Sequence, residues 1–436
     1  MKGVLKMSTK ADILKMIGEE GVEFIRLQFT NIFGALKNIA VTPSQIDKLL
    51  DNKYSFVGSA LFGERFKYDD MLYLYPEPDS FMILPWRPQQ GKVAKIVCDV
   101  CYEDGRPFEL SSRYILKNVL KGVKDKGYTV MADPECEFFL FNTDENGLPT
   151  TKSYEMAGYL DVGPSDFGEN ARRDIVLMLE EMGFEIVSSH HEHAPAQHEI
   201  DFEESEALLA ADSIQNFRFA VRSIAKRFGL YATFMPKPNK DVAGSGMHTH
   251  FTILKNGRNI FRNEDGTPSE EALYFTGGIL AHARALSAIA NPTVNSYKRL
   301  LSGFDAPNKI CWDYKGEDAL VKVSSGISDT KVELRFPDGS CNPYLLLAAC
   351  ITAGLDGIEK KTGPGENLKQ APADKEYNTL PENLREAVDE LKADELIRKA
   401  LGEEFTDIYC DIKYREWRDY MCDVSSWEID RYLTRI

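Results

Sequence analysis

The residues best suited to chemistry begin with two glutamates, Glu135 and Glu137, in the segment 130–141. The apolar and aromatic residues that follow in alternation predict a strand, in which residues two apart point to the same side. Two carboxylates side by side in apolar surroundings repel each other unless one is protonated or a cation lies between them. A divalent cation held by oxygen ligands is one interpretation, and an edge strand with two solvated glutamates is the other.

Histidines gather in two further strand-like segments. The chain has seven histidines, and six lie at positions 190, 191, 193, 198, 248 and 250. Glu192 and Glu199 flank the turn 194–196, so a hairpin there would bring their carboxylates towards each other. His282 stands apart on a predicted helix, and we expect it to be structural.

Two more segments carry ionisable residues on a single strand face. His248 and His250 share a face by the period of two and follow the loop 243–246, whose glycines let backbone approach a ligand. Glu333 and Arg335 share a face of another predicted strand in the same way. Each strand-like segment therefore offers an acid or an imidazole for a common site.

Together these residues suit a pair of metal ions. The contributing segments are 135–141, 186–193, 198–202, 248–254 and 332–336. Five glutamates and one or two histidines favour Mg²⁺ or Mn²⁺ over zinc, which takes more nitrogen and sulfur. Beside Arg299 and Arg335, two such ions would suit a polyanion and a carboxylate, for which ATP and an amino acid are one natural pair. The alternative is a set of unrelated charged strand faces.

The phosphate-binding motifs of other nucleotide enzymes are absent. The sequence has no Walker loop and no GxGxxG motif. A phosphate site in this chain would therefore depend on metal ions and arginine.

The elements that must position these residues alternate between helix and strand. A helix capped at Ser111 or Ser112 ends at Gly127, a second ends at Gly183 and a third at Gly229. Each leads into a strand, which predicts a catalytic α/β layer.

A smaller α+β unit of about a hundred residues is predicted before this layer. Its expected elements are a helix at 10–20, strands at 24–29 and 36–41, a helix from 42 to 50, a strand that runs from 53 into a glycine–serine loop by 60, and strands between 71 and 100. The turn 104–107 is the expected boundary. Near the end of the chain, Thr379 and Glu382 predict a capping box for a helix that carries Leu384 and Leu391.

The composition is that of a soluble globular protein. The 436 residues, 43% hydrophobic and 28% charged, are enough for two or more domains. No apolar run is long enough to span a membrane, and the N-terminus has no apolar run of signal-peptide length, so we expect a cytoplasmic protein. The net charge of −16 argues against nucleic acid and anionic membranes as partners. We expect the eight cysteines to be reduced core thiols, including Cys98 and Cys101 in a predicted buried strand.

The chain resembles type I glutamine synthetases over nearly its whole length. The resemblance rests on five motifs in the family's order, and the segment Asn-Pro-Thr-Val-Asn-Ser-Tyr-Lys-Arg at 291–299 is highly specific. The motif segments are 133–141, 190–200, 244–250, 291–299 and 332–338, the last followed by Asn-Pro-Tyr at 342–344. The length matches the shorter class, which lacks the inserted segment of the adenylylated enzymes.

The resemblance implies an α+β fold with two domains. These are an N-terminal β-grasp domain, residues 1–106, and a C-terminal catalytic α/β domain of glutamine synthetase type, residues 107–436. The active site is expected at a subunit boundary of a dodecamer made of two hexameric rings. By motif position, one Mg²⁺ or Mn²⁺ ion would be held by Glu137, Glu192 and Glu199, and the other by Glu135, His248 and Glu333.

The other site residues implied by the resemblance bind substrates. Arg299 and Arg335, with the backbone at Gly244, would bind glutamate, and Asp305 would join Arg299 as a catalytic residue. The positions expected to bind ATP are His250, Thr252, Lys322 and Lys331. In the implied reaction ATP phosphorylates the γ-carboxylate of glutamate, and ammonia then attacks the acyl phosphate.

Several positions depart from the family's pattern, and they concentrate in the substrate pockets. Val57 replaces the aspartate that binds ammonium, and Ala243 replaces the asparagine that opens the glycine loop. Glu317 reverses the charge of a phosphate-binding arginine. The remaining changes are Lys322 and Lys331, which keep the charge but lose the arginine fork, Asp305 in place of a flap glutamate, and Val187 in place of an acid near the nucleotide.

Three hypotheses follow for the function. The first is a glutamate–ammonia ligase. The second is a glutamate ligase for a larger amine, because Val57 and Ala243 make the ammonium site roomier and more apolar. The third is a non-catalytic relative that binds metal and nucleotide and acts in assembly or regulation, for which Glu317 is the best support. The complete set of metal ligands argues against the third.

Overall fold

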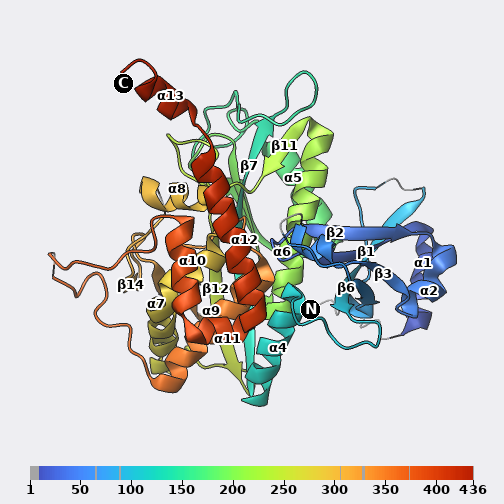
Figure 1. Cartoon of the computed structure of the whole chain (residues 1–436), viewed down its shortest axis with the longest axis horizontal. Helices are drawn as coiled ribbons and strands as arrows, with labels where there is room; N and C mark the ends of the chain where they lie inside the picture. The colour runs from blue at the N-terminus through green and yellow to red at the C-terminus, as the bar shows by residue number, and fades with distance from the viewer. Residues whose placement is uncertain are drawn as a thin grey trace.

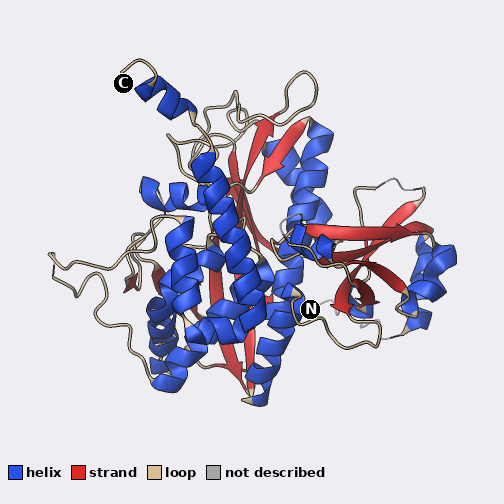
Figure 2. Cartoon of the chain, in the orientation of Figure 1, coloured by secondary structure: helices blue, strands red, loops and turns tan. Residues whose placement is uncertain are grey.

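The structure is a computed structural model that describes residues 9–63, 66–87, 90–304, 306–326, 329–372 and 374–435. A smaller N-terminal unit lies beside a larger catalytic unit (Figure 1). Both units mix helices and strands (Figure 2), so the predicted α+β class is confirmed. The domain boundary between residues 106 and 107 stays a prediction.

The N-terminal unit is built on a six-stranded sheet with the order β2-β1-β6-β4-β3 and with β5 paired to β6. β1 and β6 run parallel, and the other neighbours are antiparallel. Its elements are α1 (Lys10–Glu20), β1 (Val22–Thr30), β2 (Leu36–Val41), α2 (Ile46–Leu50), β3 (Tyr54–Val57), α3 (Ser59–Phe62), β4 (Met71–Pro76), β5 (Met82–Ile83) and β6 (Lys92–Cys101).

Most of the predicted N-terminal elements are confirmed, with one correction. The segment predicted as a glycine–serine loop forms the short helix α3 instead. Leu61 and Phe62 are fully buried there. Burial of these apolar side chains therefore decides for a helix, which the glycine and serine residues alone did not predict.

The catalytic unit is built on a ten-stranded sheet. Its main order is β14-β15-β16-β12-β7-β9-β8, with β10 and β11 paired to β7 and β13 paired to β12. Its strands are β7 (Tyr128–Asn142), β8 (Ile186–His191), β9 (Gln197–Phe202), β10 (Ser205–Glu206), β11 (Leu230–Thr233), β12 (Met247–Lys255), β13 (Arg258–Asn259), β14 (Trp312–Asp313), β15 (Val321–Ser325) and β16 (Thr330–Leu334).

Helices cover one face of this sheet. The helices are α4 (Ser112–Asp125), α5 (Glu169–Glu181), α6 (Ala207–Ala225), α7 (Glu270–Ala290), α8 (Val294–Ser302), α9 (Pro343–Lys360), α10 (Leu384–Ala393), α11 (Glu395–Leu401), α12 (Glu403–Cys422) and α13 (Ser426–Tyr432). α4 and α6 pack on β7, α7 packs on β15 and β16, and α9 packs against α4, α6 and α7. The predicted alternation of helix and strand is confirmed.

The two faces of β7 have opposite characters. Val130, Ala132, Cys136, Phe138 and Leu140 belong to the main hydrophobic core under the helices. The alternate residues, which include Glu135 and Glu137, point to the other face. The helices therefore hold β7 in place while leaving its second face for chemistry.

The predicted capping box at Thr379 and Glu382 is wrong. α10 is capped by Asn383, whose side-chain oxygen accepts from the backbone nitrogen of Glu386 at 3.0 Å. Thr379 is engaged in a β-bridge with Lys309 instead. The cap thus lies four residues later than predicted, since Thr379 already has a backbone partner.

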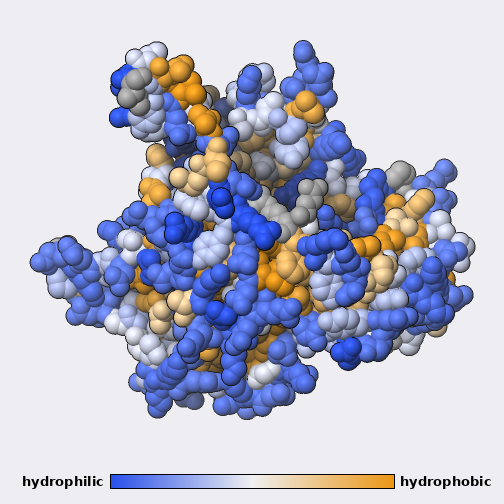
Figure 3. Space-filling view, in the orientation of Figure 1, coloured by the Kyte–Doolittle hydropathy of each residue, from blue (hydrophilic) through white to orange (hydrophobic). Residues whose placement is uncertain are grey.

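The C-terminal helix α13 projects from the body of the molecule (Figure 1). None of its residues is buried, and Trp427 and the adjacent Leu433 are 59% and 71% exposed. Hydrophobic atoms are visible on this arm in the space-filling view (Figure 3). Such an apolar arm is a surface that another chain can cover.

The cysteines and the apolar helices bear on two further predictions. All eight cysteines are free, and seven of them are buried, as predicted for reduced core thiols, whereas the prediction is wrong for Cys422, which is exposed. Among the described residues, no helix has the length and apolar character needed to cross a bilayer.

Candidate active site

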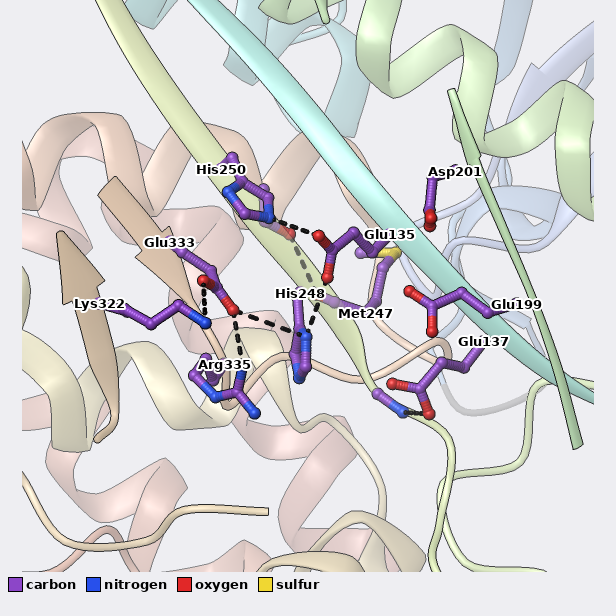
Figure 4. Close-up of polar contacts among 12 residues, drawn as sticks. Glu135, Glu137, Glu199, Asp201, Met247, His248, His250, Lys322, Glu333 and Arg335 are labelled. Carbon is purple, nitrogen blue, oxygen red and sulfur yellow. Dashed lines mark hydrogen bonds and ion pairs between the residues drawn. The ribbon is translucent and has the colours of Figure 1, made fainter. Parts of the chain in front are cut away.

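Strand register brings the predicted metal ligands Glu135, Glu137, Glu199, His248 and Glu333 onto one face of the catalytic sheet (Figure 4). β7 lies between β12 and β9, so Glu135 stands opposite His248 on one side and Asp201 on the other. Two residues along, Glu137 stands opposite Glu199. Because directly opposed residues in a sheet have neighbouring side chains, β7 places one glutamate in each of two clusters.

The first cluster, which we call the paired cluster, consists of Glu135, His248, His250, Lys322, Glu333 and Arg335. Glu135 accepts from His248 Nδ1 at 3.1 Å through Oε2 and from His250 Nε2 at 2.8 Å through Oε1. Glu333 lies 3.7 Å from His248 Nδ1 and directly opposite His250 in the sheet. The imidazoles thus lie between two carboxylates.

Cations complete the paired cluster from the next strands. Arg335 Nη1 donates to Glu333 Oε1 at 2.8 Å, and Lys322 Nζ lies 3.0 Å from Glu333 Oε2. Glu317 reaches in from a largely exposed position, 2.8 Å from Arg335 Nη2 and 3.5 Å from Lys322 Nζ. Every carboxylate in the paired cluster therefore has a basic neighbour.

The second cluster, which we call the acidic cluster, consists of Glu137, His190, Glu192, Glu199 and Asp201. Its three glutamates are buried, with no more than 9% of each residue exposed. The imidazole of His190 lies 3.4 Å from Glu192 and 3.8 Å from Glu199. The cluster contains four carboxylates, and the charge of the neighbouring Arg299 acts on one of them, Glu137.

Protein groups hold the acidic cluster in shape. Glu137 Oε2 accepts from Gln197 Nε2 at 2.7 Å and from the backbone nitrogen of Gly246 at 3.0 Å. Glu192 Oε2 accepts from the backbone nitrogen and from Nδ1 of His193, both at 2.9 Å. These bonds orient the carboxylates without neutralising them.

The pKa values of the two clusters move in opposite directions. Burial acts to raise the pKa of Glu135, but hydrogen bonds from His248 and His250 outweigh it, so that pKa lies below its usual value. Burial also acts to raise the pKa of Glu333, but the charges of the two histidines outweigh it, so this pKa is lowered as well.

In the acidic cluster, by contrast, burial outweighs the effects that would lower the carboxylate pKa values. Burial, and then the negative charge of Glu137, raise the pKa of Glu199. The pKa of Glu137 is also raised, chiefly by burial, which the nearby charges of His248 and Arg299 offset only in part. Burial and the charge of Glu135 raise the pKa of Asp201.

The donor sets fit divalent cations. Buried carboxylates with raised pKa values are the groups that a cation would return to their charged form. The ligands are oxygens with a few imidazole nitrogens, which suits Mg²⁺ or Mn²⁺. His248 Nε2 is also buried without a hydrogen-bond partner among the described residues.

The structure groups the ligand atoms somewhat differently from the predicted sets. The atoms that converge most closely belong to Glu135, His250 and Glu333 in one group and to His190, Glu192 and Glu199 in the other. His248 and Glu137 were predicted ligands, and they lie in the same clusters. The assignment of individual ligands to two ions stays a prediction.

The predicted glutamate-binding residues lie next to the acidic cluster. Arg299 is 2% exposed and donates to the backbone oxygens of Phe336 at 2.9 Å and Arg335 at 3.2 Å. A Cβ at Gly244 would lie 2.1 Å from the backbone oxygen of Pro236, so this close approach requires glycine. Their role in binding glutamate stays a prediction.

The predicted ATP-binding residues lie in or beside the paired cluster. Thr252 follows His250 by two residues on β12 and is buried. Lys331 Nζ is 2.8 Å from Asp133 Oδ2 and 4.0 Å from Glu204 Oε2, so it is already paired. Asp305, predicted as catalytic, lies outside the described residues.

The departures from the family pattern have distinct environments. Ala243 is buried in a small apolar cluster with Phe139, Phe141, Ala194 and Ala196. Val57 and Val187 are 50% and 58% exposed. The substituted residue is therefore packed among apolar side chains at one position and lies on the surface at the other two.

Sequence reasoning missed several residues of this site. Asp201 shares a face of β9 with Glu199, so the period of two along this strand was the signal that could have found Asp201. Gln197 and His190 lie in the motif segment 190–200, but no ligand or binding role was assigned to either residue. Their positions depend on the register of β8 and β9, which no local pattern encodes.

A third group of ionisable residues lies beneath the acidic cluster. His191 Nε2 is 2.9 Å from Glu155 Oε1, and His191 Nδ1 bonds the backbone oxygen of Glu192 at 2.7 Å. Glu155 also accepts from the backbone nitrogen of Ala196. Glu155 therefore braces the turn that carries Glu192.

Comparison with known proteins identifies the family of the chain. The family model "Glutamine synthetase, catalytic domain" matches residues 109–432, and "Glutamine synthetase, beta-Grasp domain" matches residues 21–103. The chain belongs to the glutamine synthetase family. Both the predicted family and the predicted β-grasp and catalytic domains are thereby confirmed.

Individual relatives extend the match to the whole chain. Glutamine synthetase of Clostridium saccharobutylicum is 48% identical over 98% of this chain and 99% of its own length. That of Thermus thermophilus is 46% identical over 98% and 99%. Among solved structures, a GmaS/ADP complex superposes with a TM-score of 0.87 at 33% identity, covering 96% of this chain and 99% of the other.

Proposed function

We propose that the protein is an ATP-dependent carbon–nitrogen ligase that joins glutamate to ammonia through a γ-glutamyl phosphate. The observation that carries this function is the buried acidic cluster beside the paired cluster on one sheet face, with Arg335 at its edge. Membership of the glutamine synthetase family over nearly the full chain supports the same reaction.

The two clusters would hold two Mg²⁺ or Mn²⁺ ions. Bound there, the ions supply charge neutralisation for the phosphoryl group in transfer. One ion is assigned to Glu137, Glu192 and Glu199 and the other to Glu135, His248 and Glu333. His250, Thr252, Lys322 and Lys331 are assigned to ATP, and the similar GmaS structure is likewise a complex with an adenine nucleotide, ADP.

The chain's own residues would orient glutamate. Arg335 presents a guanidinium beside Glu333, and the backbone at Gly244 can approach a ligand because that residue has no side chain. Arg299 braces the same region through backbone oxygens. We assign Asp305 and Arg299 to the catalytic step, with Arg299 acting on the substrate's charge.

A larger amine is the second candidate for the nucleophile. Ala243 adjoins Gly244 and packs in an apolar cluster, where the family places an asparagine. An apolar pocket favours an alkylamine over ammonium. This hypothesis keeps the glutamate and ATP sites unchanged.

A single assay tests these functions. Purified protein with Mg²⁺ or Mn²⁺, ATP and glutamate is given ammonium or a panel of amines, and phosphate release is measured. Turnover with ammonium supports the first function, and turnover confined to a larger amine supports the second. ATP and metal binding with no turnover for any amine would overturn both in favour of a regulatory relative.

We also propose that the protein is cytoplasmic and self-associates, with a dodecamer of two hexameric rings as the expected assembly. The exposed apolar arm formed by α13 supports self-association. Light scattering after chromatography tests this, alone and after truncation at Cys422. A monomer at micromolar concentration would contradict it.

A further inference from the structure

A pocket with a volume of about 320 Å³ lies where the N-terminal sheet meets α6. One wall is formed by β1, β2 and the turn between them, and the other by α6. α6 packs on the core face of β7, so this pocket and the carboxylate clusters lie on opposite sides of the catalytic sheet. The N-terminal pocket, as we call it, is therefore separate from the proposed active site.

Basic side chains gather at the N-terminal pocket. It is lined by Arg26, Lys37, Arg218 and Arg222, and Arg87 lies close enough to act on Arg26. No aspartate or glutamate is among its lining residues, and none of these cations forms a salt bridge with a residue that the structure describes. Such a gathering is unexpected in a chain with 68 acidic and 52 basic residues.

The gathering of these cations is electrostatically unfavourable. Burial, and then the charge of Arg87, lower the pKa of Arg26. Burial, and then the charge of Arg218, lower the pKa of Arg222. Like charges that share a partly buried site are stabilised when an anion lies between them.

The side chains are also held in position. Arg218 Nη1 donates to the backbone oxygen of Cys341 at 2.8 Å, and the Arg222 guanidinium lies 5.1 Å from the centre of the Phe234 ring. Arg26 lies 5.9 Å from the centre of the Phe219 ring. Fixed guanidinium forks lose little freedom when they bind, which favours recognition of a phosphate or carboxylate.

We propose that the N-terminal pocket binds a small organic anion with at least two negative charges, either a phosphate ester or a polycarboxylate. Arg26 would contact it from the N-terminal sheet, and Arg218 and Arg222 from α6. The volume lies at the lower end of the range for small-molecule sites, which excludes a large ligand.

Such a ligand would tie the two units together. Gln215 already joins them, since its Nε2 donates to Thr30 Oγ1 at 3.2 Å and to the backbone oxygen of Gly34 at 3.1 Å. An anion bound beside Gln215 would add contacts across the same boundary. Binding should therefore raise the melting temperature.

Isothermal titration of the full-length protein with pyrophosphate, citrate and adenosine monophosphate tests the proposal. We expect at least one of them to bind at one molecule per chain. Affinity should fall about tenfold or more in Arg222→Gln and in Arg26→Gln, and less in Arg222→Lys, which keeps the charge but loses the fork. The ranking of the three probes distinguishes phosphate from carboxylate recognition.

Two control variants locate the bound anion. Arg258→Gln removes an exposed arginine on β13, and Arg335→Gln removes one from the paired cluster; neither should alter this binding. Loss of binding in Arg335→Gln alone would place the anion in the active site and overturn the proposal. Absence of binding by all three probes would also overturn the proposal. A further contrary result would be that no anion binds and that Arg222→Gln changes the mass of the oligomer. The pocket would then be filled by acidic residues of another copy of the chain.

Discussion

The paired and acidic clusters share strand β7, on which Glu135 and Glu137 lie two residues apart. The two clusters nevertheless differ in the balance of acidic and basic side chains. In the paired cluster His248, His250 and Arg335 stand beside the carboxylates, whereas in the acidic cluster the imidazoles of His190 and His193 lie beside Glu192. The paired cluster is therefore stable as a set of protein groups. The acidic cluster is stable only with a proton or a cation among its carboxylates.

The difference separates the residues that maintain the fold from those that bind an ion. Removing a carboxylate from the paired cluster leaves basic groups without partners, which costs stability. Removing one from the acidic cluster relieves repulsion, which increases stability but removes a ligand. Four experiments test this contrast, from the largest expected effect to the smallest.

Glu333→Ala should lower turnover by at least about a thousandfold, because it removes a predicted metal ligand and leaves Arg335 and Lys322 unpaired. Phosphate release under the conditions of the amine assay measures this. Glu145→Ala, which changes an exposed loop glutamate, is the matched control and should retain full activity. Near-normal turnover in Glu333→Ala would remove the basis for the metal assignment.

Glu199→Gln should weaken Mn²⁺ binding about a hundredfold, yet make the metal-free protein more stable by roughly 1–2 kcal/mol. Glu333→Gln should instead destabilise the metal-free protein by about 1–3 kcal/mol, because Arg335 and Lys322 lose a buried partner. Calorimetric Mn²⁺ titration and urea unfolding in EDTA measure the two quantities. Equal stability changes of the same sign would show that the clusters do not differ as inferred.

The stability of the metal-free protein should fall as pH rises from about 5.5 to 8. The raised pKa of Glu199 means that the folded state keeps a proton which the unfolded chain has lost above about pH 5. The unfolded state then binds fewer protons, so the free energy of unfolding decreases with pH, by at most about 1.4 kcal/mol per pH unit for one group.

Melting temperatures in EDTA across this pH range test the sign. Glu199→Gln should show a flatter profile than the unmodified protein, since it cannot hold the proton. Added Mn²⁺ should bind more tightly as pH rises, because binding displaces the same proton. A profile that is unchanged by Glu199→Gln would assign the proton to another group.

Glu317→Gln should lower the KM for glutamate by up to about fivefold, with kcat nearly unchanged. Glu317 occupies Arg335 Nη2 at 2.8 Å, so an incoming carboxylate has to displace it. The Glu317 side chain is 70% exposed, which limits the pair to about 1 kcal/mol. Asp318→Asn, next to it on the same exposed segment, is the control. An increase in KM would show that Glu317 assists substrate binding.

The sequence predicted which residues belong to the site better than it predicted which of them contact one another. Alternation along single strands identified Glu135, Glu137 and Glu333, because period two depends only on local geometry. Pairing between strands distant in the chain placed His250 opposite Glu333 and brought Asp201 beside Glu135. Such pairing depends on long-range register, which is not readable from a single segment.

Helices and turns show the same limit. The helix at 10–20 and the hairpin after it were predicted correctly from local patterns. The cap at Asn383 and the helix α3 were missed, since a β-bridge at Thr379 and the burial of Phe62 decided them. Glu317 could be recognised as a charge reversal, but its contact with Arg335 required the fold.

The position of Glu135 and Glu137 on one uninterrupted strand has a further consequence. Successive same-face residues of a strand are about 7 Å apart, a repeat set by the pleat of the backbone. β7 therefore fixes the distance between the two clusters, because neighbouring strands are hydrogen-bonded along both of its edges. Loops around the site can vary in length and composition while the separation between the clusters stays constant.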